Sequence, residues 1–154
     1  MRKTLMILGL AFIGLCGLTA VRAAEPEPKL PPGPILDRHE LMKGIGKNAK
    51  VIGDAMKSGN FAPVGEAAEK IQTAAAKITA LFPPGSTHAN SRAKPEIWTD
   101  WPKFETGTKQ LETSAGALAS AAKSGGNIPT AAQTMFDSCK SCHDQFRVPE
   151  KKKQ

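Results

Sequence analysis

Aromatic residues are scarce in this sequence, which has no tyrosine and only two tryptophans, so that Phe, Trp and Tyr make up 5% of its 154 residues. No segment alternates apolar and polar residues with the two-residue period of a half-buried strand. The one long apolar run, Leu5–Ala20, is short for a membrane-spanning helix, and Pro26 and Pro28 follow it. These absences argue against a β-sheet protein and against stable insertion of the chain in a membrane.

The N-terminal apolar run has the features of a secretory signal peptide. Arg2 and Lys3 form a short basic region before it, and Val21-Arg22-Ala23 places small residues at the −3 and −1 positions of a cleavage site. We therefore predict a signal peptide over residues 1–23, with cleavage after Ala23 and export to the periplasm. Cys16 lies inside this segment and is removed with it.

Acidic residues are outnumbered by basic ones, 14 to 21, but the excess is mild once the signal peptide is set aside. The signal peptide holds three of the basic residues, and three others stand together as Lys151-Lys152-Lys153 in a basic tail over residues 149–154. A bias of this size can steer an acidic protein partner, and it is too weak to indicate nucleic-acid binding.

Apolar residues at helical spacing are abundant from residue 35 onward, after a proline-rich arm over residues 24–34. Four such stripes follow one another, and glycine or proline marks their ends. They are Ile35–Met56, Phe61–Phe82, Trp98–Ala122 and Ile128–Phe146. Two connections are short and one, over residues 83–97, is long. The sequence therefore predicts an all-α, antiparallel four-helix bundle over residues 35–148.

The segment Cys139-Lys140-Ser141-Cys142-His143 carries the most specific chemical signal in the sequence. Two cysteines three positions apart lie on one face of a helix, so both sulfurs can form thioethers with the same porphyrin edge. C-x-x-C-H is the attachment pattern of c-type haem, in which the histidine binds the iron. The sequence thus predicts one covalent haem c, attached at Cys139 and Cys142, with His143 as the proximal ligand. A haem would also supply flat apolar surface to a core that is poor in aromatic residues.

The same motif can also be read as a structural disulfide, a thioredoxin-like redox pair or half of a zinc site. Zinc usually needs a second pair of ligands at comparable spacing, and His39 and His88 stand alone. A thioredoxin-like pair opens a helix after a strand, whereas this motif lies late in a helical stripe with no strand pattern before it.

With its C-x-x-C-H motif near the C-terminus, after three helical stripes, the chain resembles the cytochrome c′ family, or class II cytochromes c. The resemblance covers nearly the whole chain after the signal peptide. Three stretches carry it: Cys139–Arg147 (CKSCHDQFR), Arg38–Lys43 (RHELMK) and Pro95–Trp98 (PEIW). It implies an antiparallel four-helix bundle with one haem c, whose iron is bound by the motif histidine.

The resemblance also implies roles for two residues of the first helix. Arg38 matches an arginine that lies near the haem propionates, and a guanidinium pairs well with a carboxylate. Met42 matches the distal position, which divides the family. One branch binds the iron through a methionine and is low-spin, whereas cytochrome c′ proper keeps the iron five-coordinate and high-spin behind a bulky side chain. Leu41-Met42-Lys43, followed by Gly46-Lys47-Asn48, is more similar to the low-spin branch, so we expect Met42 to be the distal iron ligand.

These features predict an exported mono-haem cytochrome that carries single electrons between redox partner proteins, of which an acidic one would suit the charge of the chain. The alternative is a five-coordinate cytochrome c′ that binds nitric oxide or carbon monoxide, with Met42 only shielding the iron.

A third reading, a haem peroxidase, would need a distal acid–base residue, for which only His39 is available. No nucleophile or array of bases indicates catalysis, so we expect no enzyme activity. Relatives often form dimers through their helices, which allows a homodimer, although no apolar stripe here is wide enough to demand one.

Overall fold

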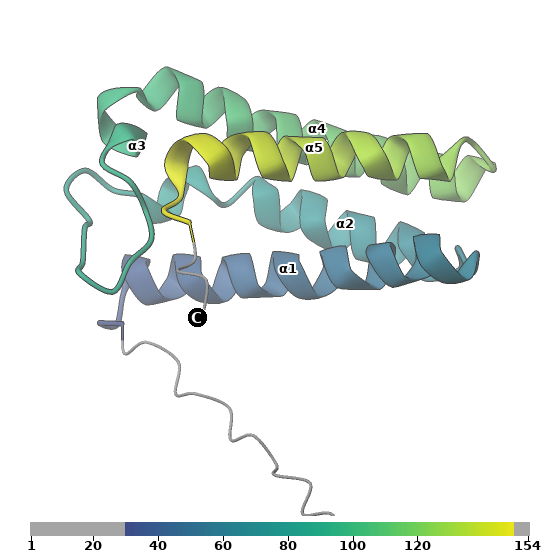
Figure 1. Cartoon of the computed structure of the whole chain (residues 1–154), viewed down its shortest axis with the longest axis horizontal. Helices are drawn as coiled ribbons and strands as arrows, with labels where there is room; N and C mark the ends of the chain where they lie inside the picture. Colours follow the sequence, from purple (N-terminus) through teal and green to yellow (C-terminus); the bar gives the residue numbers. More distant parts are fainter. Residues whose placement is uncertain (1–29, 150–154) are drawn as a thin grey trace, which may run out of the picture.

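A computed structural model describes residues 30–149 of the chain (Figure 1). Its helices are α1 (Pro34–Ser58), α2 (Val64–Ala75), the short 3-10 helix η1 (Thr79–Leu81), α3 (Glu96–Thr99), α4 (Trp101–Ser124) and α5 (Ile128–Phe146). The four longer helices lie side by side, which confirms the predicted all-α bundle. The expected signal peptide, most of the proline-rich arm and the tail lysines lie outside the described residues.

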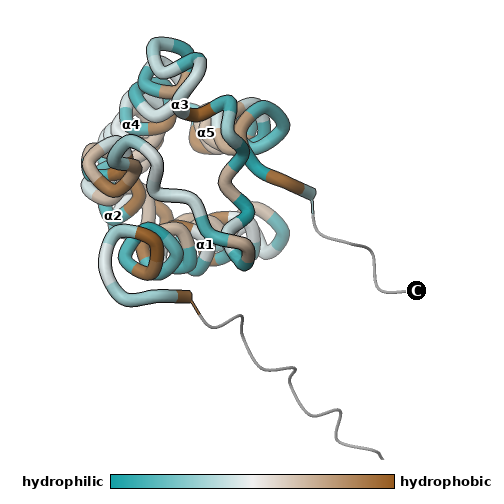
Figure 2. Tube along the Cα trace, turned by 90° about the vertical axis from the view of Figure 1, so that its left-hand side faces the viewer, coloured by the Kyte–Doolittle hydropathy of each residue, from teal (hydrophilic) through white to brown (hydrophobic). Residues whose placement is uncertain are grey.

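Neighbouring helices of the bundle do not pack equally well. α1 packs on α2, α2 on α4 and α4 on α5, each through an extensive interface, whereas α1 and α5 contact each other far less. Figure 2 looks along the helices and shows α1 and α5 standing apart. Buried alanines, which let helix backbones approach closely, are frequent in the well-packed part: Ala67, Ala68, Ala75, Ala115 and Ala119.

The first helix begins and ends where its sequence indicates. Pro34 occupies the first turn, Asp37 places a negative charge near the N-terminus, and Lys57 lies in the last turn. Gly59 then takes a left-handed conformation, with φ of 73°, and its N–H bonds to the carbonyl of Ala55. The expectation that a glycine or proline marks the end of this stripe is therefore confirmed at Gly59.

The second helix is shorter than its apolar stripe predicts. α2 ends at Ala75, and a turn and η1 follow it before Phe82. Ile78 and Phe82 are nevertheless buried, at 2% and 6% exposure. The apolar stripe thus predicts correctly which side chains are buried, although the backbone changes from α-helix to 3-10 helix within it.

The third predicted helix is interrupted near its start. Asp100 separates α3 from α4, with φ of −128° and ψ of 53°. Pro102 explains the break, because a proline lacks the backbone N–H and its ring clashes with the carbonyl four residues earlier, here that of Trp98. The proline is accommodated in the first turn of α4, where its missing N–H costs no helix hydrogen bond.

Aromatic side chains gather where α1 begins and α5 ends. Phe104 of α4 packs edge-on against Phe82 and Phe146, with ring centroids 4.9 and 5.3 Å apart, and lies 5.5 Å from the ring of Trp101. Trp98 stands 6.5 Å from Phe82. The two tryptophans therefore have a packing role, and five aromatic side chains form one cluster beside the C-x-x-C-H end of α5.

Asn127 is the N-cap of α5, since its side-chain oxygen accepts a hydrogen bond from the backbone N–H of Thr130 at 3.0 Å. We predict that Asn127→Ala lowers the free energy of unfolding of the haem-loaded protein by about 1 kcal/mol. Asn127→Asp retains the acceptor and should restore stability. Urea unfolding followed by circular dichroism measures the difference. Equal stability of Asn127→Ala and the native chain would contradict a capping role.

None of the helices within residues 30–149 combines the length and the apolar character needed to cross a bilayer.

Candidate functional site

The two motif cysteines occupy one face of α5, as their spacing predicts. Both are free thiols and both are partly buried against the core. Helix α4 comes close to the second: a Cβ at Gly107 would lie 3.6 Å from Sγ of Cys142. The absence of a side chain at Gly107 leaves room beside this sulfur. The disulfide reading of the motif finds no support here, since the structure pairs neither thiol.

Burial controls the ionisation of all three motif residues. It raises the pKa of the Cys139 thiol, and together with the charge of Cys139 it raises the pKa of Cys142 to about 11. The pKa of His143 is lowered, mainly by burial and then by the positive charges of Arg147 and Arg92. Both thiols are therefore protonated at neutral pH, and the imidazole is neutral with a nitrogen lone pair available for a metal.

These ionisation states distinguish between the readings of the motif. Reactive thioredoxin-like cysteines have a lowered pKa, which is the opposite of what burial does here. A zinc site would need further ligands, and among the described residues no three His, Cys, Asp or Glu side chains converge to hold a metal. Two neutral thiols one turn apart, followed by a neutral imidazole, fit a c-type haem.

Met42 lies on the face of α1 that is turned toward α5. A Cβ at Gly53 would meet Cζ of Phe136, on α5, at 4.0 Å, so Gly53 faces that helix. Met42 is eleven positions earlier, which is about three turns and leaves the two residues within about 20° around the helix axis. The side chain is partly buried and packs on the core. The geometry thus directs Met42 toward α5, the helix that carries the C-x-x-C-H motif.

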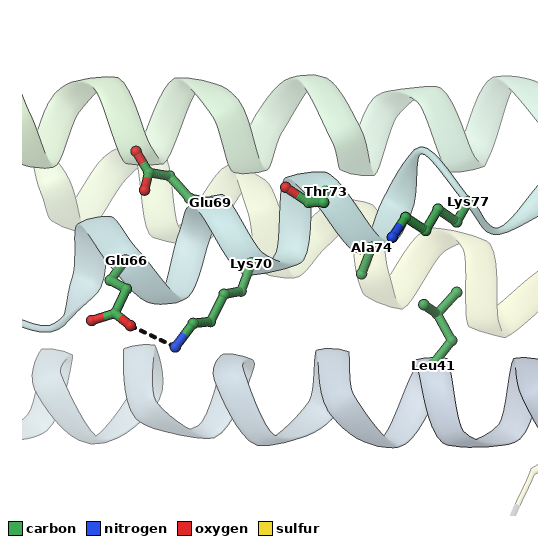
Figure 3. A pocket seen from close by; sticks show the side chains of 7 residues that line it. All are labelled: Leu41, Glu66, Glu69, Lys70, Thr73, Ala74 and Lys77. Atoms are coloured by element: carbon green, nitrogen blue, oxygen red, sulfur yellow. Dashed lines mark hydrogen bonds and ion pairs between the residues drawn. The ribbon is translucent and has the colours of Figure 1, made fainter.

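The neighbouring residue, Leu41, faces another way. It lines a shallow groove between α1 and α2, together with residues that include the Glu66–Lys70 ion pair (Figure 3). The groove is lined by no cysteine, histidine or methionine, so it is not where a haem would attach. Because successive helix residues are about 100° apart, the direction of Leu41 toward α2 agrees with that of Met42 toward α5.

Arg38 is buried, with 4% exposure, and its guanidinium is held by uncharged groups. Nη1 donates to Oγ of Ser86 at 2.8 Å and to the carbonyl of Leu81 at 3.5 Å. Nη2 donates to the carbonyl of Ser86 at 2.6 Å and to Oγ of Ser91 at 3.2 Å. The guanidinium carbon also stands 4.6 Å from the ring centroid of Phe82, which is favourable for a cation. Burial lowers the pKa of Arg38. The expected contact with a haem propionate stays a prediction, and a propionate would compete with the two serines.

Sequence reasoning missed the residues that hold Arg38. Ser86 and Ser91 lie in a long connection in which nothing but polar composition marks them, and they are 48 and 53 positions from Arg38.

His39, the residue considered for a peroxidase, is partly buried on α1. Met135 is fully buried and Met56 partly buried against the core, where the apolar stripes place them.

The arrangement fits the haem that the motif predicts. Its attachment groups lie on α5, and the candidate distal residue lies on α1. These two helices pack weakly on each other but tightly on the rest of the bundle. Met42, Cys139 and Cys142 are only partly buried by the packing of the helices. A flat apolar group between α1 and α5 would contact these side chains.

Comparison with known proteins agrees with this geometry. Residues 33–147 match the family model described as Cytochrome C'. A curated cytochrome c′ of Rhodospirillum rubrum is 28% identical over 151 residues, which cover 95% of this chain and 99% of that protein. A cytochrome c-556 of Agrobacterium tumefaciens is 30% identical over 120 residues, covering 75% of this chain and 98% of its own length.

Solved structures share the fold. The crystal structure of cytochrome c′ from Thermochromatium tepidum superposes with a TM-score of 0.70 at 27% identity, and the match covers 75% of this chain and 95% of that one.

Proposed function

Since the chain belongs to the cytochrome c′ family and, with it, carries one covalent haem c, we propose that its iron is five-coordinate and binds nitric oxide or carbon monoxide on the side opposite His143. The observation that carries this proposal is the match, over almost the full length of both chains, to a protein named cytochrome c′. Cytochrome c′ proper is the branch with an open sixth position. The preference for the low-spin branch, drawn from the residues around Met42, is not confirmed by these comparisons.

The side chains of this protein have distinct tasks in the proposal. Cys139 and Cys142 attach the haem to α5, and the neutral imidazole of His143 holds the iron from one side. Haem, when bound, supplies an iron centre that takes up a small ligand or an electron. Met42, from α1, covers the opposite side and limits what can approach it. The Ala-rich packing of α2 on α4 keeps the scaffold of the site rigid.

The second candidate is the electron carrier expected from the sequence. The orientation of Met42 toward α5 favours it, because a thioether sulfur that reaches the iron would fill the sixth position and raise the reduction potential. A cytochrome c-556 among the relatives is compatible with a family that includes more than one type. In this case the protein would pass single electrons between redox partners.

Export, partners and the absence of catalysis are also proposals. The leader over residues 1–23 and the need to attach haem c outside the cytosol support a periplasmic location. The mild positive charge suits an acidic redox partner rather than nucleic acid, and a homodimer through the helices remains part of the proposal. We expect no enzyme activity, since no arrangement of acid, base and nucleophile within residues 30–149 supports one.

Carbon monoxide separates the two candidate functions. We predict that the reduced, haem-loaded protein binds one equivalent of carbon monoxide promptly, and that the ferric protein gives a high-spin EPR spectrum, because the sixth position is open. Optical titration and EPR of the purified protein are the measurements. A low-spin ferric spectrum without stoichiometric binding would reject the gas-binding proposal and support ligation by Met42.

A further inference from the structure

The two helices that carry the candidate iron-facing residues contact each other little, so their spacing has another cause. α1 carries Met42 and α5 carries His143, and direct packing between these helices is sparse. The connection between η1 and α3, residues 82–95, loops over the end of the bundle where α1 begins and α5 ends (Figure 1). We call this connection the strap. It contacts both helices.

The strap is fixed to α1 through Arg38. The two terminal nitrogens of the guanidinium bond to Ser86 and Ser91, at 2.6 to 3.2 Å, and the buried ring of Phe82 lies beneath it. A buried cation that lost these acceptors would remain desolvated without compensation, which is costly. Arg38 therefore holds the strap firmly to the first turns of α1.

The strap is fixed to the end of α5 by backbone and side-chain bonds. Residues 92–94 pair with residues 146–148: the Lys94 N–H donates to the Phe146 carbonyl at 3.0 Å, and the Val148 N–H donates to the Arg92 carbonyl at 2.8 Å. Nζ of Lys94 donates to the carbonyls of Asp144 and Gln145 at 3.0 and 3.1 Å. These are among the last carbonyls of α5, where a cation is favourable.

The base of the strap is also anchored in the core. Nε1 of Trp98 donates to the carbonyls of Phe82 and Pro83, at 3.2 and 3.0 Å, which closes the connection on itself. Because these bonds hold the two ends of the strap together, a movement of the strap would be transmitted to α1 and α5.

Both anchor points adjoin the candidate iron-facing residues. Arg38 is four residues, or about 6 Å along the helix, before Met42. Asp144, whose carbonyl accepts from Lys94, directly follows His143. We propose that the strap sets the distance between α1 and α5 at the haem, so that Ser86, Ser91 and Lys94 are positioning residues for Met42. This inference rests on the proposed function in one respect, that α5 carries the haem and Met42 faces it.

The test leaves Arg38 in place, because this residue is also expected near a propionate. We compare a Ser86→Ala/Ser91→Ala variant and a Lys94→Ala variant with a control, Ser58→Ala/Ser124→Ala, which removes two serines at the opposite end of the bundle. All are studied as haem-loaded proteins. We expect both strap variants to change the rate of carbon monoxide association by at least about threefold. The serine variant removes hydrogen bonds that Arg38 of α1 donates, and Lys94→Ala removes those to the α5 carbonyls, so in both variants α1 is free to shift relative to α5. The control should match the native protein.

Hydrogen exchange supplies a measurement that does not depend on ligand binding. Amides of α1 around Met42 should exchange faster in the strap variants, while those in the middle of α4 keep their native rates. Carbon monoxide association and α1 exchange both equal to those of the control would overturn the inference, even if the variants unfold at a lower temperature. Lys94→Arg retains a donor and should lie closer to the native protein than Lys94→Ala.

The inference remains testable if the gas-binding proposal fails. In a native protein that is low-spin and does not bind carbon monoxide, the strap variants should raise the high-spin fraction of the ferric EPR spectrum relative to the control. In such a low-spin protein, an unchanged high-spin fraction would reject the strap as a positioning element.

Discussion

A Cys139→Ser/Cys142→Ser variant is expected to be exported without covalent haem, so its intact mass will equal that of the bare processed polypeptide. The hydroxyl of serine cannot replace the thiol in forming a thioether. The bundle should also lose stability, because the weakly packed α1 and α5 would lack the flat apolar group between them. We expect the thermal midpoint to fall by at least about 10 °C, equivalent to roughly 2 to 3 kcal/mol.

Ser141→Ala is the matched control for this variant, since it changes an exposed residue in the same turn of α5. It should retain the haem mass and the native midpoint. Mass spectrometry and a haem stain after denaturing electrophoresis measure attachment, and calorimetry measures the midpoint. A haem that stays attached after denaturation of the double variant would show that the motif cysteines do not hold it.

Substitutions at Met42 are expected to give the second large effect, and they also discriminate between the two functions. If Met42 shields an open position, Met42→Ala will leave the spin state unchanged and accelerate carbon monoxide association about tenfold, equivalent to about 1.4 kcal/mol of barrier. If its sulfur binds the iron, the same change will convert low-spin iron to high-spin iron and lower the reduction potential.

Met42→Leu isolates the contribution of the sulfur from that of bulk. Leucine has a similar volume but no ligand atom, so a shielding role predicts native spectra and native binding rates for this variant. Ligation predicts that Met42→Leu becomes high-spin, as Met42→Ala does. Visible and EPR spectra, with redox titration, decide. Native spectra and native ligand binding in both variants would show that Met42 does not face the iron.

Several features of the fold were predictable from short stretches of sequence, because their causes are local. The left-handed Gly59 ends α1, Pro102 is confined to the first turn of α4, and Asn127 caps α5 within three residues of itself. The predicted haem attachment on α5 also has a local basis, since the two sulfurs and the imidazole lie within five consecutive residues. Helical periodicity identified the buried faces correctly even where, between residues 76 and 82, the backbone is not α-helical.

Other features depend on residues that are far apart in the chain. Met42 and Gly53 share one face of α1, but only the approach of Phe136 to Gly53 shows that this face is turned toward α5. The acceptors of Arg38 are about fifty positions away from it. Sequence patterns predict which residues are buried. The partner of a buried polar group depends on which distant segment the fold places beside it.

The sequence by itself therefore determined the cofactor and the four-helix architecture, and it predicts the attachment residues, because haem attachment and helix formation both depend on neighbours within one or two turns. The tertiary structure alone decided that α1 and α5 pack sparsely on each other, and which residues connect them through the strap. The bonds between the strap, the start of α1 and the end of α5, from which we infer the spacing of the two helices, join three segments that only the folded chain brings together.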